Sequence, residues 1–128
     1  LDPSLLELCR LIFARQHGDA VEIAATNPFV ENSVENQRLR VETLEDRILD
    51  ALTLPDGWQS VLRFAEYYWV DVGSIPDELA DQVKEEHGDA ALVLLIEALG
   101  CIDGRIRAAR CLRDLFPNLR MQEDRYVI

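Results

Sequence analysis

Positive charge is scarce in this chain. Its 128 residues contain 24 Asp and Glu but only 13 Lys and Arg, which gives a formal net charge of −11. Nucleic acid is therefore not expected as a partner, because a phosphate backbone repels an acidic protein whose basic residues do not cluster strongly. The arginines at positions 105, 107, 110 and 113 do cluster. They fall near the end of an expected helix, and we interpret them as charges that offset the helix dipole rather than as a phosphate-binding patch.

Long apolar runs and a signal sequence are also lacking. The longest apolar run spans residues 90–96 and ends at Glu97. That is well short of the roughly 20 residues that cross a bilayer. The chain does not open with the basic and apolar segments of a signal peptide. We therefore expect no membrane partner and a cytoplasmic location.

Cysteine is rare, and its spacing excludes a disulfide framework. The chain has three cysteines, Cys9, Cys101 and Cys111. An odd number of widely spaced cysteines is not typical of a disulfide-stapled fold. The last two lie on one expected helix, about 15 Å apart at 1.5 Å per residue, which is too far for a disulfide. We expect all three to be buried free thiols, with a disulfide from Cys9 to Cys101 or Cys111 across helices as the alternative.

Helical periodicity is what the sequence has in abundance. Apolar residues recur at helical spacing, and no segment alternates convincingly with period two, so we predict an all-α single-domain bundle of about six helices. Residues 1–117 form the domain, and the tail at 118–128 has no clear period. The pattern is weak over residues 29–40, where we expect a loose helix or an ordered loop. The other helices are predicted at residues 3–17, 19–26, 43–52, 58–70, 76–86 and 89–116, with Thr43 as the cap of the third and Gly100 and Gly104 as candidate kink positions in the last.

Both histidines lie in the same tetrapeptide, His-Gly-Asp-Ala, at residues 17–20 and 87–90. Glycine favours the position after a helix and aspartate favours the position before one, so each tetrapeptide predicts a helix–helix junction. In the first copy, Asp19 and Glu22 have the spacing of a capping box. A duplicated two-helix unit and a chance reuse of a favourable junction both remain open.

Several segments, taken in order, resemble the carboxymuconolactone decarboxylase superfamily, which includes alkylhydroperoxidase D. Residues 64–66 (Phe-Ala-Glu), 73–79 (Gly-Ser-Ile-Pro-Asp-Glu-Leu) and 87–93 (His-Gly-Asp-Ala-Ala-Leu-Val) are similar to its C-terminal half. Residues 5–11, followed by Gly18, are similar to the helix before its active site. The resemblance covers most of residues 3–112. It implies an all-α, alkylhydroperoxidase D-like fold and a homo-oligomer, either a trimer or a hexamer.

The redox centre of that family is missing from this chain. Its peroxidase members carry a Glu, then a Cys-x-x-Cys pair, then a His. Glu7 matches the Glu, whereas the two cysteine positions fall on Asp19 and Glu22 and the histidine position falls on Thr26. The Asn-rich stretch of the family's last helix is also absent, since residues 101–105 read Cys-Ile-Asp-Gly-Arg. Without the cysteine pair there is no thiolate to reduce a peroxide.

The residues that replace the redox centre form a candidate pocket. Glu7, His17, Asp19 and Glu22 are residue types that hold a divalent metal or carry out acid–base catalysis. We favour a structural interpretation, because a capping box accounts for Asp19 and Glu22 and the helix dipole favours His17 in a last turn. We expect no metal site and no cofactor.

Two classes of function follow from these residues. The first is a degenerate alkylhydroperoxidase D-like domain that acts by binding a small molecule or a protein and by oligomerisation. The alternative is a decarboxylase-like lyase, in which Glu7 and His17 share proton transfer beside Asp19 and Glu22. That mechanism requires the side chains of Glu7, His17 and Glu22 to converge on one cavity. A regulatory domain of a larger protein is the third possibility.

Overall fold

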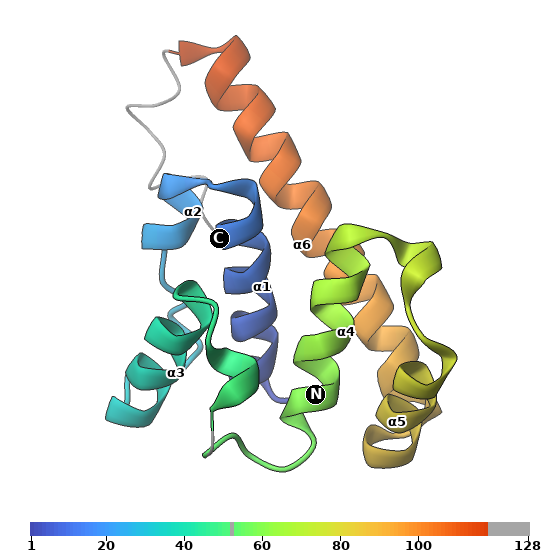
Figure 1. Ribbon diagram of the computed structural model, residues 1–128. Helices are drawn as coiled ribbons and strands as arrows, with labels where there is room; N and C mark the ends of the chain where they lie inside the picture. The colour runs from blue at the N-terminus through green and yellow to red at the C-terminus, as the bar shows by residue number, and fades with distance from the viewer. Residues whose placement is uncertain (52, 118–128) are drawn as a thin grey trace.

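Six α-helices and two short 3₁₀ helices make up the computed structural model, which describes residues 1–51 and 53–117 (Figure 1). The described part contains no strand, so the prediction of an all-α single domain is confirmed. The predicted tail at 118–128 lies outside the described residues. The elements are α1 (Pro3–His17), α2 (Ala20–Ala24), α3 (Val34–Leu44), η1 (Ile48–Asp50), α4 (Trp58–Val70), η2 (Val72–Ser74), α5 (Asp77–His87) and α6 (Asp89–Leu115).

Helix α1 lies at the centre of the molecule and contacts α2, α3, α4 and α6 (Figure 1). It begins where the Asp2 carboxylate accepts a hydrogen bond of 2.7 Å from the Ser4 amide, and Pro3 occupies the first helical position. It ends at Gly18, which has a φ of 62°. These ends follow the cap residues in the sequence, because aspartate satisfies free amides and glycine tolerates a left-handed conformation.

One hydrophobic core joins α1 to the helices around it. The central position of α1 explains why residues on more than one of its faces are buried. The largest fully buried apolar side chains come from α1, α3, η1, α4 and α6, and they are Leu5, Leu11, Ile12, Phe13, Leu39, Ile48, Val61, Leu62, Leu95, Leu99 and Ile106.

The region between α2 and α4 differs from the prediction. Helix α3 spans Val34–Leu44, with Ser33 rather than Thr43 as its cap. The Ser33 hydroxyl accepts a hydrogen bond of 3.0 Å from the Asn36 amide, whereas the Thr43 hydroxyl donates to the Leu39 carbonyl inside the helix. The predicted helix at 43–52 is therefore wrong, and Leu52 itself lies outside the described residues. The apolar pattern over residues 29–40 is weak because α3 buries only Leu39 and Thr43.

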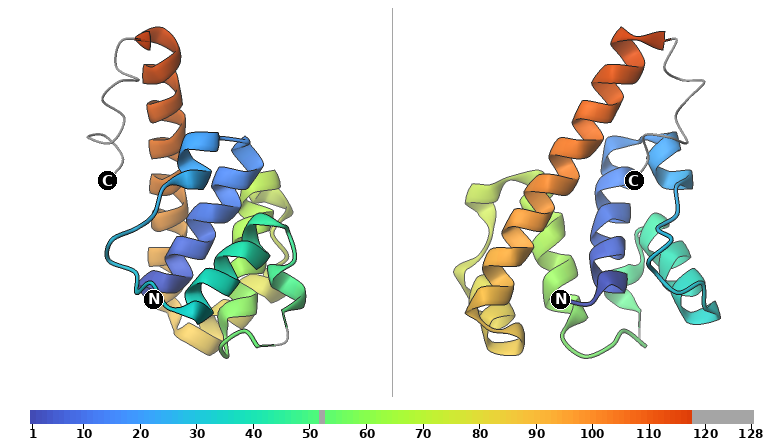
Figure 2. Two further views of the ribbon diagram at one scale, coloured as in Figure 1. Left: turned by 90° about the vertical axis from the view of Figure 1, so that its left-hand side faces the viewer. Right: turned by 180° about the vertical axis from the view of Figure 1, so that it is seen from behind.

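Helix α6 runs across one face of the molecule and extends past the α1–α2 corner (Figure 2). It is continuous through Gly100 and Gly104. Cys101 and Cys111 are exposed on it, so the expectation that they are buried is wrong, although Cys9 is buried. Among the described residues, no helix has the length and apolarity needed to cross a membrane.

Candidate functional site

The corner between α1 and α2 holds the residues at the family's cysteine positions. Asp19 caps α2, because its Oδ1 accepts a hydrogen bond of 3.1 Å from the Glu22 amide. The second half of the predicted capping box is not formed. The Asp19 amide donates to the Ala14 carbonyl, and the Glu22 carboxylate turns toward α1 and α6 instead. The capping box therefore explains Asp19 but not the side chain of Glu22.

Glu22 is a buried carboxylate between two arginines. It is 1% exposed, and its Oε1 accepts from Nη1 of Arg10 at 3.0 Å. Arg105 of α6 donates to both of its oxygens. Burial alone would raise the pKa of Glu22, but the hydrogen bonds and charges of Arg105 and Arg10 hold it below its usual value. Glu22 is therefore an anion that joins α1, α2 and α6.

Arg10 brings Glu7 and Glu22 together. Its Nε and Nη2 donate to the two oxygens of Glu7 at 2.5 and 3.0 Å. Its Nη groups also donate to the backbone carbonyls of Glu22 and Ala25, at 2.7 and 2.9 Å. Burial alone would lower the pKa of Arg10, but the two carboxylates raise it. One guanidinium thus holds two predicted site residues and the end of α2.

His17 belongs to a separate cluster. Its Nε2 lies 2.8 Å from Oδ1 of Asp103, and its ring meets Trp69 edge-on with centroids 4.5 Å apart. Arg107 donates to the other Asp103 oxygen at 2.8 Å. Burial alone would raise the pKa of Asp103, but Arg107 and His17 lower it. His17 follows Glu7 by ten residues on α1, a rise of about 15 Å, so the two side chains do not converge.

Three of the four clustered arginines, Arg105, Arg110 and Arg113, attach α6 to the corner, a role that the sequence interpretation missed. Arg113 forms an ion pair with Asp19, and Arg110 donates to the His17 carbonyl at 3.0 Å. Only Arg113 lies in the last turn of α6, so the helix dipole does not account for the group. A signal was present in the sequence. Arg113 lies seven residues after the buried Ile106 and shares its helix face, and a cation on a core-facing stripe requires an acidic partner.

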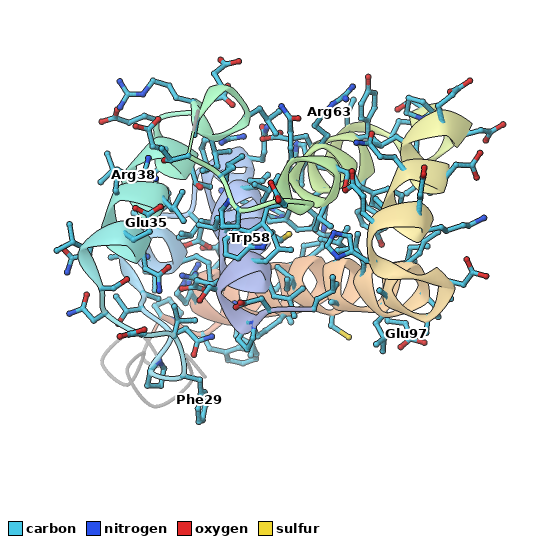
Figure 3. The ribbon with its side chains drawn as sticks, turned by 90° about the horizontal axis from the view of Figure 1, so that it is seen from below. Phe29, Glu35, Arg38, Trp58, Arg63 and Glu97 are labelled. Carbon is cyan, nitrogen blue, oxygen red and sulfur yellow. The ribbon has the colours of Figure 1, made fainter. Side chains whose placement is uncertain are left out.

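A groove of about 470 Å³ lies between α1, residues 26–32 and α3. Glu7 lines it, whereas Asp19 lines a smaller hollow of about 310 Å³ with Arg110 and Arg113. We call the larger one the α1–α3 groove. Phe29 is 87% exposed and points away from the body of the protein (Figure 3). The groove is lined by Ser4, Glu7, Leu8, Leu11, Thr26, Asn27, Pro28, Val30, Glu31, Asn32, Asn36, Gln37 and Arg40.

Arg40 is the cation in the groove wall. It donates to the Ala25 carbonyl at 3.3 Å and to the Ile23 carbonyl, so it holds the end of α2. Burial lowers the pKa of Arg40, and the nearby charge of Arg10 lowers it further. Within residues 1–51 and 53–117, no carboxylate forms an ion pair with Arg40, and no group of His, Cys, Asp and Glu is placed to hold a metal ion.

Comparison with known proteins identifies no relative. No protein-family model matches the chain, and neither a curated protein nor a solved structure matches it. The likeness to the carboxymuconolactone decarboxylase superfamily therefore remains a resemblance of short motifs and their order.

Proposed function

We propose that this protein is a non-redox, alkylhydroperoxidase D-like domain that binds a small molecule in the α1–α3 groove. The observation that carries the proposal is the groove itself, about 470 Å³ in volume and bordered by Glu7 and Arg40. Ligand pockets in proteins typically measure about 300–1,000 Å³. The groove is therefore large enough for a small organic molecule.

The lining of the groove suits a ligand with an apolar body and polar groups. Leu8, Leu11 and Val30 supply apolar contacts, and Pro28 extends that surface. The amides at positions 27, 32, 36 and 37 and the charged groups of Glu7, Glu31 and Arg40 supply hydrogen bonds. An apolar wall with a few convergent polar groups is the usual composition of a small-molecule site.

Peroxidase chemistry is not part of the proposal. The residues at the family's cysteine positions, Asp19 and Glu22, are engaged by arginines of α6. Cys9 is close to Glu7 in sequence, but its thiol is fully buried, and burial raises its pKa to about 12. A peroxide-reducing cysteine needs an accessible thiolate. We expect thiol-dependent peroxide reduction at the rate of the buffer alone, measured by peroxide consumption with dithiothreitol as donor.

Fragment binding followed by amide NMR tests the groove directly. Benzoate, benzamide, benzylamine and cyclohexanol cover an anion, a neutral amide, a cation and an alcohol. We expect at least one of them to shift the resonances of residues 26–37 and the first turns of α1. Val30→Trp fills the groove and should abolish those shifts, whereas Phe29→Trp places the same indole ring at an exposed neighbour and should preserve them. The proposal is wrong if no fragment perturbs these resonances, or if both variants behave alike.

A second candidate is a lyase in which Glu7 alone acts as the acid–base group. The favouring observation is that Glu7 lines the groove. His17 has no part in this version, because it pairs with Asp103 on another side of α1. Exchange of the α-protons of cyclohexanone in D₂O, followed by NMR, tests this activity. The lyase proposal requires that the protein exchange these protons faster than the buffer does, and that Glu7→Gln lose this exchange.

We also propose that the protein assembles as a homo-oligomer, a trimer or a hexamer by the resemblance. Helix α6 supports assembly because it carries large apolar side chains that are exposed in the single chain, among them Val93, Leu94 and Leu115. Analytical ultracentrifugation gives the number of copies, and a monomer across the accessible concentration range contradicts assembly.

A further inference from the structure

The outward face of α6 is apolar where a solvent-facing helix is normally polar. Seven of its exposed positions follow the alternating three- and four-residue spacing of a helix that packs against another helix. We call this stripe the α6 seam. Glu97 is its only charged member. The seam consists of Leu94, Glu97, Cys101, Gly104, Ala108, Cys111 and Leu115, all of them exposed.

No described element covers this face. In the view from behind, α6 runs across the front of the molecule with α1 and α4 beyond it (Figure 2). Seen from below, Glu97 points away from α4 (Figure 3). The opposite side of the same helix packs into the core through Leu92, Leu95, Leu99 and Ile106. The seam residues therefore take no part in the core of the single chain.

Gly104 is the residue that packing within one chain does not explain. It lies inside α6, where glycine is less favourable than alanine because of its backbone entropy. A Cβ at this position would meet nothing within 4 Å. Alanine would therefore fit and would strengthen the helix. A glycine on an exposed face has a physical purpose when a second backbone approaches closely at that point.

The pattern of the seam is complementary to itself in an antiparallel arrangement. Large side chains, Leu94 and Leu115, stand near its two ends, and Gly104 and Ala108 give a narrow centre. When two copies cross at Gly104 in opposite directions, Glu97 of one copy lies opposite Cys111 of the other, so the two Glu97 carboxylates are far apart. A parallel pair would place the Glu97 carboxylates against each other, which is unfavourable. Charge and shape therefore favour a second copy, antiparallel, as the occupant.

We propose that two copies of this chain pack antiparallel along the α6 seam and cross at Gly104. The contact extends from Leu94 to Leu115, a length of about 32 Å at 1.5 Å per residue. This interface is isologous, because each copy presents the same surface to the other. The inference rests on the proposed assembly and assigns it a surface. A two-fold contact fits a hexamer, in which pairs are possible, and it excludes an isolated trimer.

Sedimentation of Gly104→Glu tests the seam. Glutamate favours helix more than glycine does and has open space at this position, so the circular dichroism of the variant should match or exceed that of the wild type. We expect Gly104→Glu to lose the dimeric contact. Val41→Glu adds the same charge at an exposed apolar position on α3 and should assemble like the wild type.

Disulfide trapping tests the direction of packing. In a Glu97→Cys, Cys101→Ser variant, the antiparallel arrangement places residue 97 opposite the native Cys111 of the second copy. Oxidation should then give a covalent dimer whose peptides join positions 97 and 111. Peptides that join 97 to 97 overturn the antiparallel packing. If Gly104→Glu assembles like the wild type, the seam is not the interface, but the proposed assembly still holds. If the wild type itself is a monomer, both the seam and the proposed assembly are wrong.

Discussion

Removing the guanidinium of Arg10 should be among the most destabilising single changes in this fold. Arg10 is the only link between the carboxylates of Glu7 and Glu22 in the described part of the chain. The side chains of Arg10, Glu7 and Glu22 are 12%, 9% and 1% exposed. Arg10→Met keeps most of the aliphatic stem but leaves both carboxylates close together without their shared cation. It also removes the donor of the Glu22 carbonyl and leaves the Ala25 carbonyl with only the longer hydrogen bond from Arg40.

The expected cost is about 3–5 kcal/mol, the range found when one partner of a buried ion pair is removed. Domains of this kind have a total stability of about 5–15 kcal/mol, so the loss is a large fraction of the whole. Urea unfolding followed by circular dichroism measures it.

Arg38→Met is the control, because Arg38 and Glu35 form an exposed pair on α3 (Figure 3), and we expect no measurable shift there. Glu22 keeps Arg105 in Arg10→Met, so the double variant Arg10→Met, Glu7→Met removes the stranded carboxylate and should recover part of the loss. A cost for Arg10→Met below about 1 kcal/mol, which is ordinary for a surface pair, refutes the reasoning.

Three further results are expected. Because the folded state lowers the pKa of Glu22 from its ordinary 4.5, its ion pairs stabilise the fold above that pH and are lost as the pH falls through the folded pKa; Glu22→Gln should flatten that part of the stability–pH curve, and an unchanged slope contradicts the assignment. Cys101 and Cys111 should react promptly with Ellman's reagent in the native protein, while buried Cys9 reacts only after unfolding; three fast thiols would show that Cys9 is accessible. Gly57→Ala should cost about 1–2 kcal/mol in thermal or urea unfolding, because residue 57 has a φ of 80° and a new Cβ would lie 3.0 Å from Nε2 of His87; a neutral effect would contradict that geometry.

The sequence predicts helix ends where a local signal marks them. Asp2 with Pro3, Gly18 and Asp19 mark the ends of α1 and the start of α2, and each acts within a few residues of its position. The predicted bounds of α4, residues 58–70, are those observed. Helix α3 was predicted only as a loose helix or a loop, since a helix that contacts the core through few residues has little apolar periodicity.

The partners of Asp19 and Glu22 on α6 were beyond local patterns, unlike the pair of Glu7 with Arg10, which are three residues apart on α1. Glu22 meets Arg105 across 83 residues of sequence, and Asp19 meets Arg113 across 94. Spacing rules describe neighbours one or two helical turns apart, so they assigned Glu22 to a capping box and the arginines to a helix dipole. Only the packing of α6 against the α1–α2 corner brings these charges together.

The contrast between the corner and the groove is the reason why we propose the groove as the ligand site. At the corner, Asp19 and Glu22 already bond to arginines of α6, and no buried polar side-chain atom in the described residues lacks a partner. A ligand there would have to break ion pairs that hold the fold together. In the α1–α3 groove, the hydroxyls of Ser4 and Thr26 form no hydrogen bond with other described residues. A ligand can bond to these hydroxyls beside the apolar wall without breaking an ion pair. We therefore propose that the ligand binds in the groove and not at the position that corresponds to the redox centre of the resembled family.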